Sequence, residues 1–425
     1  MKITNVRVLQ LEGRPRSGLA LYEIPRGGRA AGEATPHRWT FTQIETDEGL
    51  IGLTHGGSAD VKTAGRLLIG EDPTRIEYLW EKLYWALRPN VRPVALLDLA
   101  LWDLLGKIEN KPVYQLLGGS TRERIPAYAA MLGFSVEPER AARASVEYVE
   151  QGFQALKWYL PSNALDGREG MERNVALMRA VREAVGPDVR IMVDCILSGS
   201  RHNSVLYAID LARRLEPYNP TWLEEPLPVD DLDSHVKLAH STRVPLAFGE
   251  HHYTRWAIKQ ILDSGAATVI QPDPNAAGGI TEMRRIAALA STYGVILMPH
   301  ANESSRNAAH FLFSQPDRIC PMIEWGVRIN HDVQYFWKDF YGPRNGYFDP
   351  PSGPGFGYEL DPAKSPAASS FNRTEVFMLL LSEANARALC AAAFAGVGLP
   401  PDETAMCTDA ILFASLRGLD SHGIV

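Results

Sequence analysis

Three carboxylates in the middle of the chain stand where short apolar runs stop. These runs are IMVDC at 191–195, WLEEP at 222–226 and AFGE at 247–250. They place Asp194, Glu224 and Glu250 at successive intervals of 30 and 26 residues, about the length of one strand–helix repeat. The spacing predicts that the three side chains lie at the ends of neighbouring parallel strands.

Carboxylates that meet at one face repel each other unless a cation lies among them. Oxygen ligands from acidic side chains suit a hard divalent ion, and Mg²⁺ fits them best. We therefore predict a magnesium site formed by Asp194, Glu224 and Glu250. Acidic residues also follow strands simply because turns are polar. This alternative explains less well why all three carboxylates recur at the interval of one strand–helix repeat.

Five further side chains with acid–base chemistry fall near predicted strand ends. Lys157 and Tyr159 are two residues apart, so they lie on the same face of one strand. Asp273 and His300 end two adjacent strands, where the aspartate can fix the tautomer of the imidazole and raise its basicity. Glu324 closes the last strand. We predict that these residues are catalytic.

The elements that must position these residues are short strands alternating with helices. Eight apolar runs are candidate strands: 125–131, 155–160, 189–194, 221–226, 244–249, 268–273, 295–300 and 319–325. Amphipathic segments such as 171–185 and 280–293 fill the gaps between most of them. Eight repeats over about 200 residues predict a βα barrel with one closed parallel sheet. A doubly wound open sheet is the alternative, but it gives no reason for so many strands to end in functional groups.

The first 125 residues predict a separate α+β unit. Runs 2–11, 39–46 and 50–57 have the composition of an antiparallel meander, and 59–109 has helical periodicity. The loop at 14–38 is dense in Gly, Pro and Arg, and so long a loop is usually functional or disordered. The predicted parts are an α+β domain at 1–125 completed by a return segment at 326–362, a barrel at 126–325, a linker at 363–370 and a helical tail at 371–425.

Loops near the predicted barrel mouth offer candidates for substrate contacts. His37, Arg38 and His55 stand in predicted loops of the first domain, and Asn302 follows the strand end that carries His300. Arginine and histidine would suit the distal hydroxyls or a second carboxylate of a polyol acid. Solvated loop residues without a function are an equally good interpretation of these side chains.

Composition narrows the class of protein. The net charge of −7 and the pI near 5.9 argue against nucleic acid as the main partner and leave a small anionic substrate to be bound by local cations. The four cysteines show no CxxC spacing and indicate reduced thiols in a cytoplasmic protein. No apolar run approaches the roughly 20 residues that span a bilayer, so we expect no membrane insertion.

With these motifs in this order, the chain resembles the enolase superfamily, and within it the mandelate racemase-like subgroup. The matching segments are ALWDLLGK (100–107), the lysine motif at 157, Asp194, WLEEP, GE (249–250), QPDPNAAGGITE (271–282) and PH (299–300), within about residues 1–362. The resemblance implies an α+β capping domain on a modified (β/α)8 barrel of the TIM type, with (β/α)7β topology, and a homo-oligomer. Asp194, Glu224 and Glu250 match its Mg²⁺ ligands.

The same resemblance implies roles for the remaining residues. His300 with Asp273 matches the histidine–aspartate base dyad of the subgroup. Glu324 matches the acidic group that hydrogen-bonds the developing enolate oxygen, in the protonated form. Glu225 matches the second residue of the Glu-Glu-Pro turn, which is not a ligand.

One departure from the subgroup decides which reaction we expect. The lysine motif is usually Lys-x-Lys, but here Tyr159 replaces the second lysine, and a phenol with a pKa of about 10 is a weak base. Racemisation needs proton transfer on both faces of the substrate, whereas dehydration needs one base that can return as the acid. We therefore predict an acid-sugar dehydratase forming a 2-keto-3-deoxy acid. A racemase, epimerase or cycloisomerase, and a non-catalytic sugar-acid binder, remain alternatives.

The tail carries a second resemblance. Residues 396–424 resemble the N-terminal segment of the malate/L-lactate dehydrogenase family that lacks a Rossmann fold, with its Asp-Ser-His-Gly motif at 420–423. The catalytic histidine of that family falls on His422, but the rest of that fold is missing. We expect no dehydrogenase activity, and an unrelated two-helix extension is the alternative.

Overall fold

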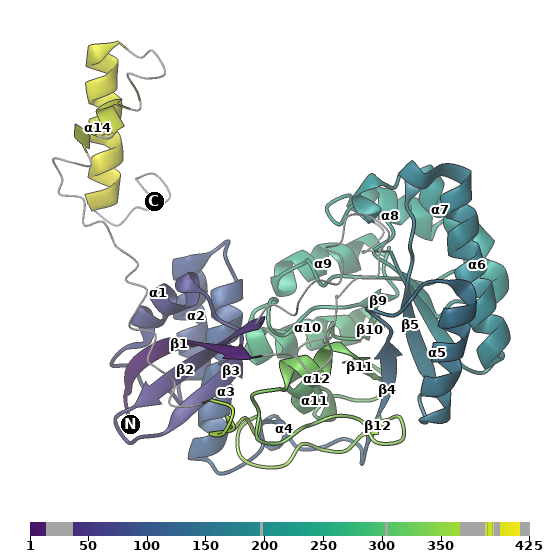
Figure 1. The fold of residues 1–425 in the computed structure, drawn as a ribbon. Coiled ribbons are helices and arrows are strands. Elements are labelled where there is room, and N and C mark those ends of the chain that lie inside the picture. Colours follow the sequence, from purple (N-terminus) through teal and green to yellow (C-terminus); the bar gives the residue numbers. More distant parts are fainter. Residues whose placement is uncertain are drawn as a thin grey trace. The chain divides into compact units, whose positions relative to one another are not determined.

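The computed structural model describes residues 1–13, 37–195, 199–301, 305–365, 387–388, 390–392, 394 and 400–416. The internal contacts of the chain divide it into two units, Met1–Ala368 and Ser369–Val425. The first unit contains a three-stranded sheet with its own helices and a larger parallel sheet surrounded by helices (Figure 1).

The N-terminal sheet is antiparallel and runs in the order β1-β2-β3, as the meander prediction requires. Its strands are β1 (Ile3–Gly13), β2 (His37–Thr46) and β3 (Ile51–His55). The helices that follow are α1 (Ala59–Gly65), α2 (Ile76–Leu87), α3 (Arg92–Ile108) and α4 (Val113–Leu116), with the 3₁₀ helix η1 (Arg66–Leu68) between α1 and α2. Helix α3 packs on the sheet because one side of it is almost continuously apolar.

The prediction that three substrate-contact candidates stand in loops is wrong. His37 and Arg38 are the first residues of β2, where they pair with Gly13 and Glu12 of β1. His55 is the last residue of β3. The reason is that the β-sheet pairing of β2 with β1 and β3 extends beyond the aromatic residues Trp39 and Phe41 and includes His37 and His55. Residues 14–36 of the predicted loop lie outside the described residues.

The second part of the first unit alternates eight strands with seven α-helices. Its strands are β4 (Ile125–Ala130), β5 (Ala155–Tyr159), β6 (Arg190–Asp194), β7 (Trp222–Glu224), β8 (Leu246–Phe248), β9 (Val269–Ile270), β10 (Ile296–Leu297) and β11 (Ile323–Gly326). The helices between them are α5 (Pro138–Glu150), α6 (Gly167–Val185), α7 (Val205–Leu215), α8 (Leu232–Ala239), α9 (Thr254–Ser264), α10 (Gly279–Tyr293) and α11 (Ser305–Phe313), and the 3₁₀ helices are η2 (Ala164–Asp166), η4 (Ser200–His202) and η5 (Glu216–Tyr218). This is the expected (β/α)7β order.

The parallel sheet runs β10-β9-β8-β7-β6-β5-β4-β11, so each strand pairs with its neighbour in sequence except at the ends. The prediction of eight parallel strands is confirmed. In the described residues no ladder joins β10 to β11, although the Leu297 amide donates to the Ile319 carbonyl at 2.8 Å. The curled sheet therefore has a seam between β10 and β11, which this backbone hydrogen bond spans.

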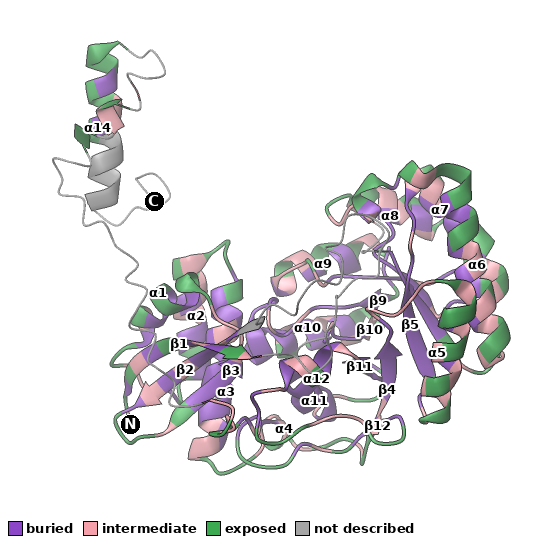
Figure 2. Cartoon of the chain, viewed as in Figure 1, coloured by how far each residue is buried: buried purple, intermediate pink, exposed green. Residues whose placement is uncertain are grey.

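The interior of the curled sheet is filled by inward-pointing side chains. They form a cluster of Tyr128, Ala155, Met192, Trp222, Ala247, Val269, Met298 and Met322. One residue comes from each of the eight strands or its immediate flank, as expected when alternate strand positions face the axis. Figure 2 shows that these strands are buried while the surrounding helices expose their outer faces. The interior is thus a packed floor beneath the strand ends.

The return segment joins the two parts of the first unit. Strand β12 (Tyr347–Phe348) pairs antiparallel with β4, and the short helix α12 (Ile329–Val333) precedes it. Phe336 and Trp337 pack edge-on against Phe41 of β2, with ring centroids 6.1 and 5.1 Å from it. The segment therefore covers the N-terminal sheet with aromatic side chains.

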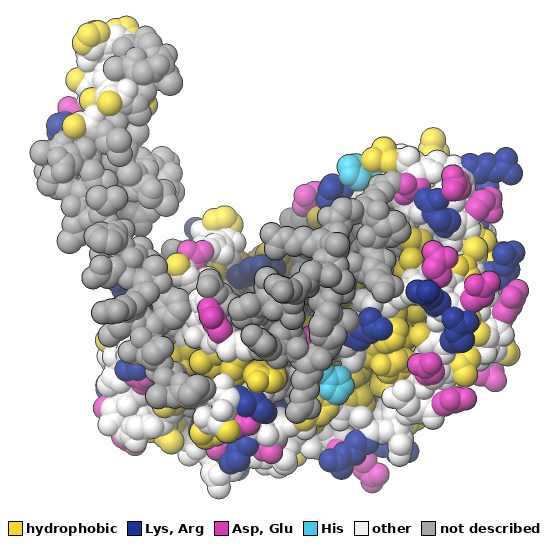
Figure 3. All heavy atoms as spheres, in the orientation of Figure 1, with side chains coloured by type: hydrophobic (Ala, Val, Ile, Leu, Met, Phe, Trp, Pro, Cys, Tyr) yellow, Lys and Arg dark blue, Asp and Glu magenta, His cyan; other side chains and the backbone are white. Residues whose placement is uncertain are grey.

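The second unit contains helix α14 (Pro401–Leu416), and Arg387 forms an ion pair with Asp409. Among the described residues, no helix combines the length and the apolar character needed to cross a membrane. Basic and acidic side chains are interspersed over the visible face of α5 to α8 (Figure 3). All four cysteines are free thiols, which agrees with the expectation from their spacing.

Asp103 of α3 connects this helix with β3 and with the return segment, and its loss should destabilise the first unit. Its fully buried carboxylate accepts the Leu53 and Phe356 amides, both at 2.8 Å, and pairs with Lys107 at 2.6 Å. We expect Asp103→Ala to lower the free energy of unfolding by about 2–5 kcal/mol, because two buried N–H groups lose their acceptor. Urea denaturation followed by circular dichroism measures this. Glu169→Ala, at an exposed carboxylate, is the control, and equal effects of both variants would contradict the prediction.

Candidate functional site

A buried ammonium group lies at the centre of the predicted site. Lys157 of β5 is fully buried, and its Nζ is 2.6 Å from Glu224, 2.8 Å from Glu324 and 3.3 Å from Asp194. Burial alone would lower the pKa of Lys157, but the charges of these carboxylates raise it well above its usual value. Lys157 is therefore protonated and compensates part of the negative charge.

The strand register explains why these groups meet. Tyr159 pairs with Asp194, and Asp194 pairs with Glu224, so the ends of β5, β6 and β7 lie level. Asp194 and Glu224 are the last residues of their strands and are 2% and 1% exposed. Parallel pairing in register thus converts a spacing in the sequence into a cluster in space.

The carboxyl groups of Asp194 and Glu224 lie at the paired ends of β6 and β7 and influence each other's titration. Burial raises the pKa of Asp194 well above its usual value, and the charge of Glu224 raises it further. Burial would also raise the pKa of Glu224, but its contacts with Lys157 and its hydrogen bonds lower it.

Two residues that the sequence analysis did not select hold the Glu224 carboxylate. Trp222 Nε1 and Gln271 Nε2 donate to its Oε2 at 2.9 and 2.8 Å. Trp222 lies two residues before Glu224 in β7 and so points to the same side of the strand. That alternation within WLEEP was the signal that could have identified it. Gln271 comes from the segment after β9, and its position relative to Glu224 depends on the strand order.

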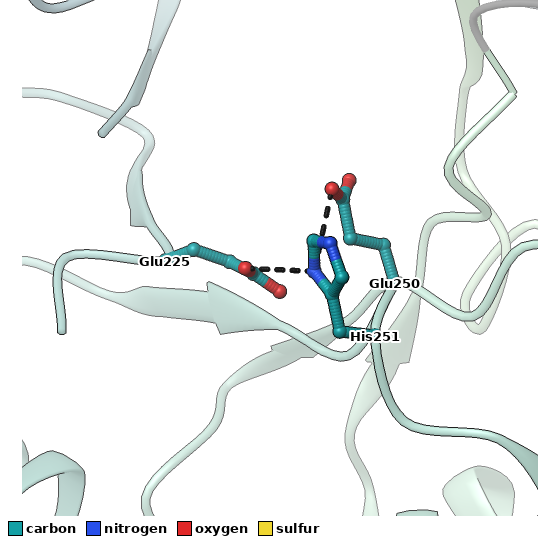
Figure 4. A group of neighbouring side chains, drawn as sticks. All are labelled: Glu225, Glu250 and His251. Carbon is teal, nitrogen blue, oxygen red and sulfur yellow. Dashed lines mark hydrogen bonds and ion pairs between the residues drawn. The ribbon is translucent and has the colours of Figure 1, made fainter. Parts of the chain in front are cut away.

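Glu250 lies two residues past β8 and contacts two imidazoles. Its carboxylate is 3.5 Å from His251 Nδ1 and 3.4 Å from His300 Nε2. His251 Nδ1 is also 3.0 Å from Glu225, which is buried and has a φ of 41° (Figure 4). Among the described residues, Glu225, Glu250 and His251 are the group whose ligand atoms lie within 4.8 Å of one another. This group shares only Glu250 with the predicted metal ligands.

His300 and Asp273 form the pair that their positions predict. His300 Nδ1 is 2.7 Å from Asp273 Oδ2, which leaves Nε2 directed toward Glu250. Burial would lower the pKa of His300, but the charge of Glu250 and the hydrogen bond to Asp273 raise it well above its usual value. Asp273 is in turn fixed by the Asn275 amide, which donates to its Oδ1 at 2.7 Å. An imidazole oriented in this way is a strong base.

Glu324 is the second residue of β11 and not its last, so it lies deeper than the sequence analysis placed it. Its Oε1 is 2.8 Å from Lys157 Nζ, and its Oε2 accepts the Ala301 amide at 2.7 Å. These two contacts fix the position of the Glu324 carboxyl group beside Lys157.

Tyr159 is buried at the end of β5, and the Lys157 ammonium lies 5.5 Å from the centre of its ring. Burial raises the pKa of the phenol well above 10. A phenol with so high a pKa does not act as a base near neutral pH. Of the residues selected from the sequence at these strand ends, His300, whose Nδ1 is held by Asp273, therefore remains the candidate base.

A cavity of about 660 Å³ opens above His300 and Asp273 and is walled by both parts of the first unit. His55, Asp60, Asn90 and Arg92 are among the polar residues that line it. Burial lowers the pKa of His55 to about 4, so its imidazole is neutral there. The structure thus brings His55 to the cavity with His300. It describes no side chain for His37 and Arg38, and Asn302 lies outside the described residues.

The residues around Asp194, Glu224 and Glu250 fit a divalent cation. The three groups offer oxygen donors only, and burial with mutual repulsion raises the pKa of Asp194 well above its usual value and that of Glu250 to about 7. The single ammonium of Lys157 leaves negative charge uncompensated at this place. A divalent ion bound to these oxygens would supply the missing positive charge.

Two family profiles match the chain. Residues 139–364 match the profile described as enolase C-terminal domain-like. Residues 30–118 match the N-terminal domain of the mandelate racemase/muconate lactonizing enzyme family. Neither match extends into 371–425, so the resemblance of the tail to a dehydrogenase is not supported.

Similar proteins include a D-galactonate dehydratase from Cronobacter sakazakii, which is 33% identical over 351 residues, covering 77% of this chain and 90% of that protein. A rhamnonate dehydratase from Gibberella zeae complexed with Mg is 31% identical with a TM-score of 0.72, covering 85% of this chain and 95% of that one. A member of the enolase superfamily from Salmonella Typhimurium is 27% identical with a TM-score of 0.73, covering 85% and 97%.

The electrostatic role of Lys157 gives a direct prediction. Replacing it by methionine keeps an unbranched side chain that is one heavy atom shorter but leaves Glu224 and Glu324 buried without their cation. We expect Lys157→Met to lower the free energy of unfolding in EDTA by about 3–5 kcal/mol. Urea denaturation gives the value. Lys338→Met, which breaks an exposed pair with Glu359, is the matched control, and a loss no larger than in that control would refute this role of Lys157.

Proposed function

Because this chain belongs to the mandelate racemase/muconate lactonizing enzyme family of the enolase superfamily, we propose that it is a metal-dependent dehydratase of acid sugars. It would remove the proton next to a carboxylate and eliminate the 3-hydroxyl, which gives a 2-keto-3-deoxy acid. The observation that carries the proposal is the oriented base His300, whose Nδ1 lies 2.7 Å from Asp273, together with Tyr159, whose pKa is too high for it to act as a second base.

Two relatives support the choice of reaction. The similar protein from Cronobacter sakazakii is a D-galactonate dehydratase, and the similar structure from Gibberella zeae is a rhamnonate dehydratase complexed with Mg. Both names describe the loss of water from a sugar acid. We infer that the substrate of this chain is also a polyhydroxylated monoacid or diacid, whose distal part would occupy the cavity lined by His55, Asn90 and Arg92.

We propose Mg²⁺ as the metal, with Asp194, Glu224 and Glu250 as its ligands. When bound, the ion would supply positive charge that stabilises the enediolate form of the substrate carboxylate. Trp222 and Gln271 hold Glu224 by hydrogen bonds of 2.9 and 2.8 Å, so one of the three carboxylates is oriented by the protein in advance.

His300 would carry out both proton transfers. Its Nε2 accepts the α-proton while Asp273 fixes Nδ1 and stabilises the imidazolium that results. The same imidazolium then gives the proton to the departing 3-hydroxyl, which leaves as water when the carbon–oxygen bond breaks. The enol product ketonises in solution or in the cavity. Lys157 and Glu324 would complete the polar wall beside the substrate carboxylate.

A panel of sugar acids tests the reaction. We expect the enzyme with Mg²⁺ to convert at least one hexonate or pentonate into a 2-keto acid, which semicarbazide detects, and EDTA to stop this conversion until Mg²⁺ is restored. The same incubation in D₂O distinguishes the alternatives. Deuterium exchange at the α-carbon without a keto product would favour a racemase or epimerase and refute the dehydratase.

The role of His300 has its own test. We expect His300→Asn to reduce kcat by about 10²–10⁴-fold, which is the range for loss of a general base, while calorimetry shows Mg²⁺ binding close to wild type. His240→Asn, at an exposed histidine of the last turn of the α8 region, should leave kcat unchanged. Full turnover by the His300→Asn enzyme would exclude His300 as the base.

A further inference from the structure

Helix α10 begins immediately after the Asp273 turn, and it lacks a capping side chain of its own. Its N-cap is Gly278, which has a φ of 118° and no side chain to accept the free amides of the first turn. Orphan amides at a buried helix start need an acceptor from elsewhere. All of the residues Gly279, Ile280, Thr281 and Glu282 in this first turn are buried. The acceptor must therefore come from a neighbouring element.

Asp98 of α3 provides that acceptor from the N-terminal part of the chain. Its fully buried carboxylate accepts the Thr281 amide at 3.0 Å and the Thr281 hydroxyl at 2.5 Å. Thr281 is the third residue of α10, which is the position that an N-cap side chain normally reaches. A Cβ at Gly279 would lie 2.3 Å from Asp98 Oδ2, so the contact also explains why glycine occupies that position.

Two tryptophans strengthen the same contact. Trp102, one turn after Asp98 in α3, donates its Nε1 to the Thr281 hydroxyl at 2.9 Å. Trp80 of α2 donates its Nε1 to the Gly278 carbonyl at 2.7 Å. Helices α2 and α3 thus hold residues 278–281 at two backbone groups, the Gly278 carbonyl and the Thr281 amide, and at the Thr281 hydroxyl.

The start of α10 is directly connected to the proposed base dyad. The Ala276 and Ala277 amides donate to the Asp273 carbonyl at 3.0 and 2.7 Å, so residues 273–277 form one tight turn. The side chain of Asp273 holds His300 at 2.7 Å. A shift of the α10 N-terminus would therefore move the carboxylate that orients the imidazole.

The start of α10 also holds the start of α9, which packs beside it (Figure 1). Glu282 is fully buried and accepts the Arg255 amide at 2.7 Å and its guanidinium at 2.6 Å. Thr254 donates its amide to the Ala277 carbonyl at 3.1 Å and has a φ of 71°, which is strained for a β-branched residue. Thr254 ends the loop that begins at Glu250.

We propose that Asp98 is a positioning residue: it caps α10 from the first domain and thereby fixes the turn that carries Asp273 and, through Glu282, the loop that carries Glu250. This inference rests on the proposed function only for its kinetic readout. It differs from a merely structural role because the expected effect is local to residues 250–282 and falls on kcat and not on substrate affinity.

The test compares two buried carboxylates of the same helix. Asp98→Ala removes the cap of α10, whereas Asp103→Ala removes acceptors that serve Leu53 and Phe356 on the other side of α3. We expect amide hydrogen exchange in 274–282 to become about tenfold faster in Asp98→Ala, as for loss of one helix cap. Asp103→Ala should leave exchange in this segment unchanged at a temperature where both variants are folded.

Kinetics and a conservative variant complete the experiment. We expect kcat of Asp98→Ala to fall at least about tenfold with KM within about threefold of wild type. Asp98→Asn should restore both exchange and kcat, because an amide can accept the Thr281 amide and donate to its hydroxyl. If Asp98→Ala does not fold, Thr281→Val, which deletes the hydroxyl contact and keeps the amide, should show the same changes to a smaller extent.

The outcomes separate the two proposals. Unchanged exchange in 274–282 in the Asp98 and Thr281 variants overturns the positioning role, whatever the activity. Equal loss of kcat in Asp98→Ala and Asp103→Ala also overturns it, because the effect would then be general destabilisation. If wild type converts no sugar acid, the proposed function fails, and the exchange comparison alone decides whether Asp98 positions the Asp273 turn.

Discussion

The site depends on the placement of one positive charge inside the barrel. Lys157 is fully buried and contacts three carboxylates, which without it would be three like charges in a medium of low polarity. Its one charge does not balance theirs: the pKa of Asp194 is raised by burial and by the charge of Glu224, and Glu250 lies 3.5 Å from His251 and 3.4 Å from His300. The negative charge that remains favours the binding of a further cation at this position. The proton transfers proposed for His300 take place beside this cation site.

Much of this arrangement could be predicted from the sequence, because a parallel barrel obeys simple spacing rules. Asp194 and Glu224 were predicted at strand ends and are the last residues of β6 and β7. Asp273 and His300 were predicted as a pair and are 2.7 Å apart. In each case a short apolar run predicted the strand, and the polar residue at the end of the run was predicted to lie at the rim of the barrel. The roles assigned to these residues await the experiments.

Other features could not be predicted, because they depend on contacts between distant segments. Residue spacing does not reveal that Glu250 lies 3.5 Å from His251, or that Glu225 is buried with a left-handed backbone. His37 and Arg38 were placed in a loop because the ladder between β1 and β2 extends beyond the apolar residues that mark it. The support of Thr281 by Asp98 joins residues 183 positions apart, and only the fold brings them together. Sequence periodicity reports on the strands and helices, whereas these contacts arise from how the elements dock.

The N-terminal sheet is completed by the far end of the first unit. Trp39 and Phe41 pack against Phe336, and Asp103 binds the Phe356 amide. A ribosome adds about 5–20 residues per second, so roughly 300 residues separate these partners by tens of seconds during synthesis. Throughout that time the nascent chain exposes aromatic surface that only its own later residues can cover. The sheet that is made first is therefore finished last, after the return segment has left the exit tunnel.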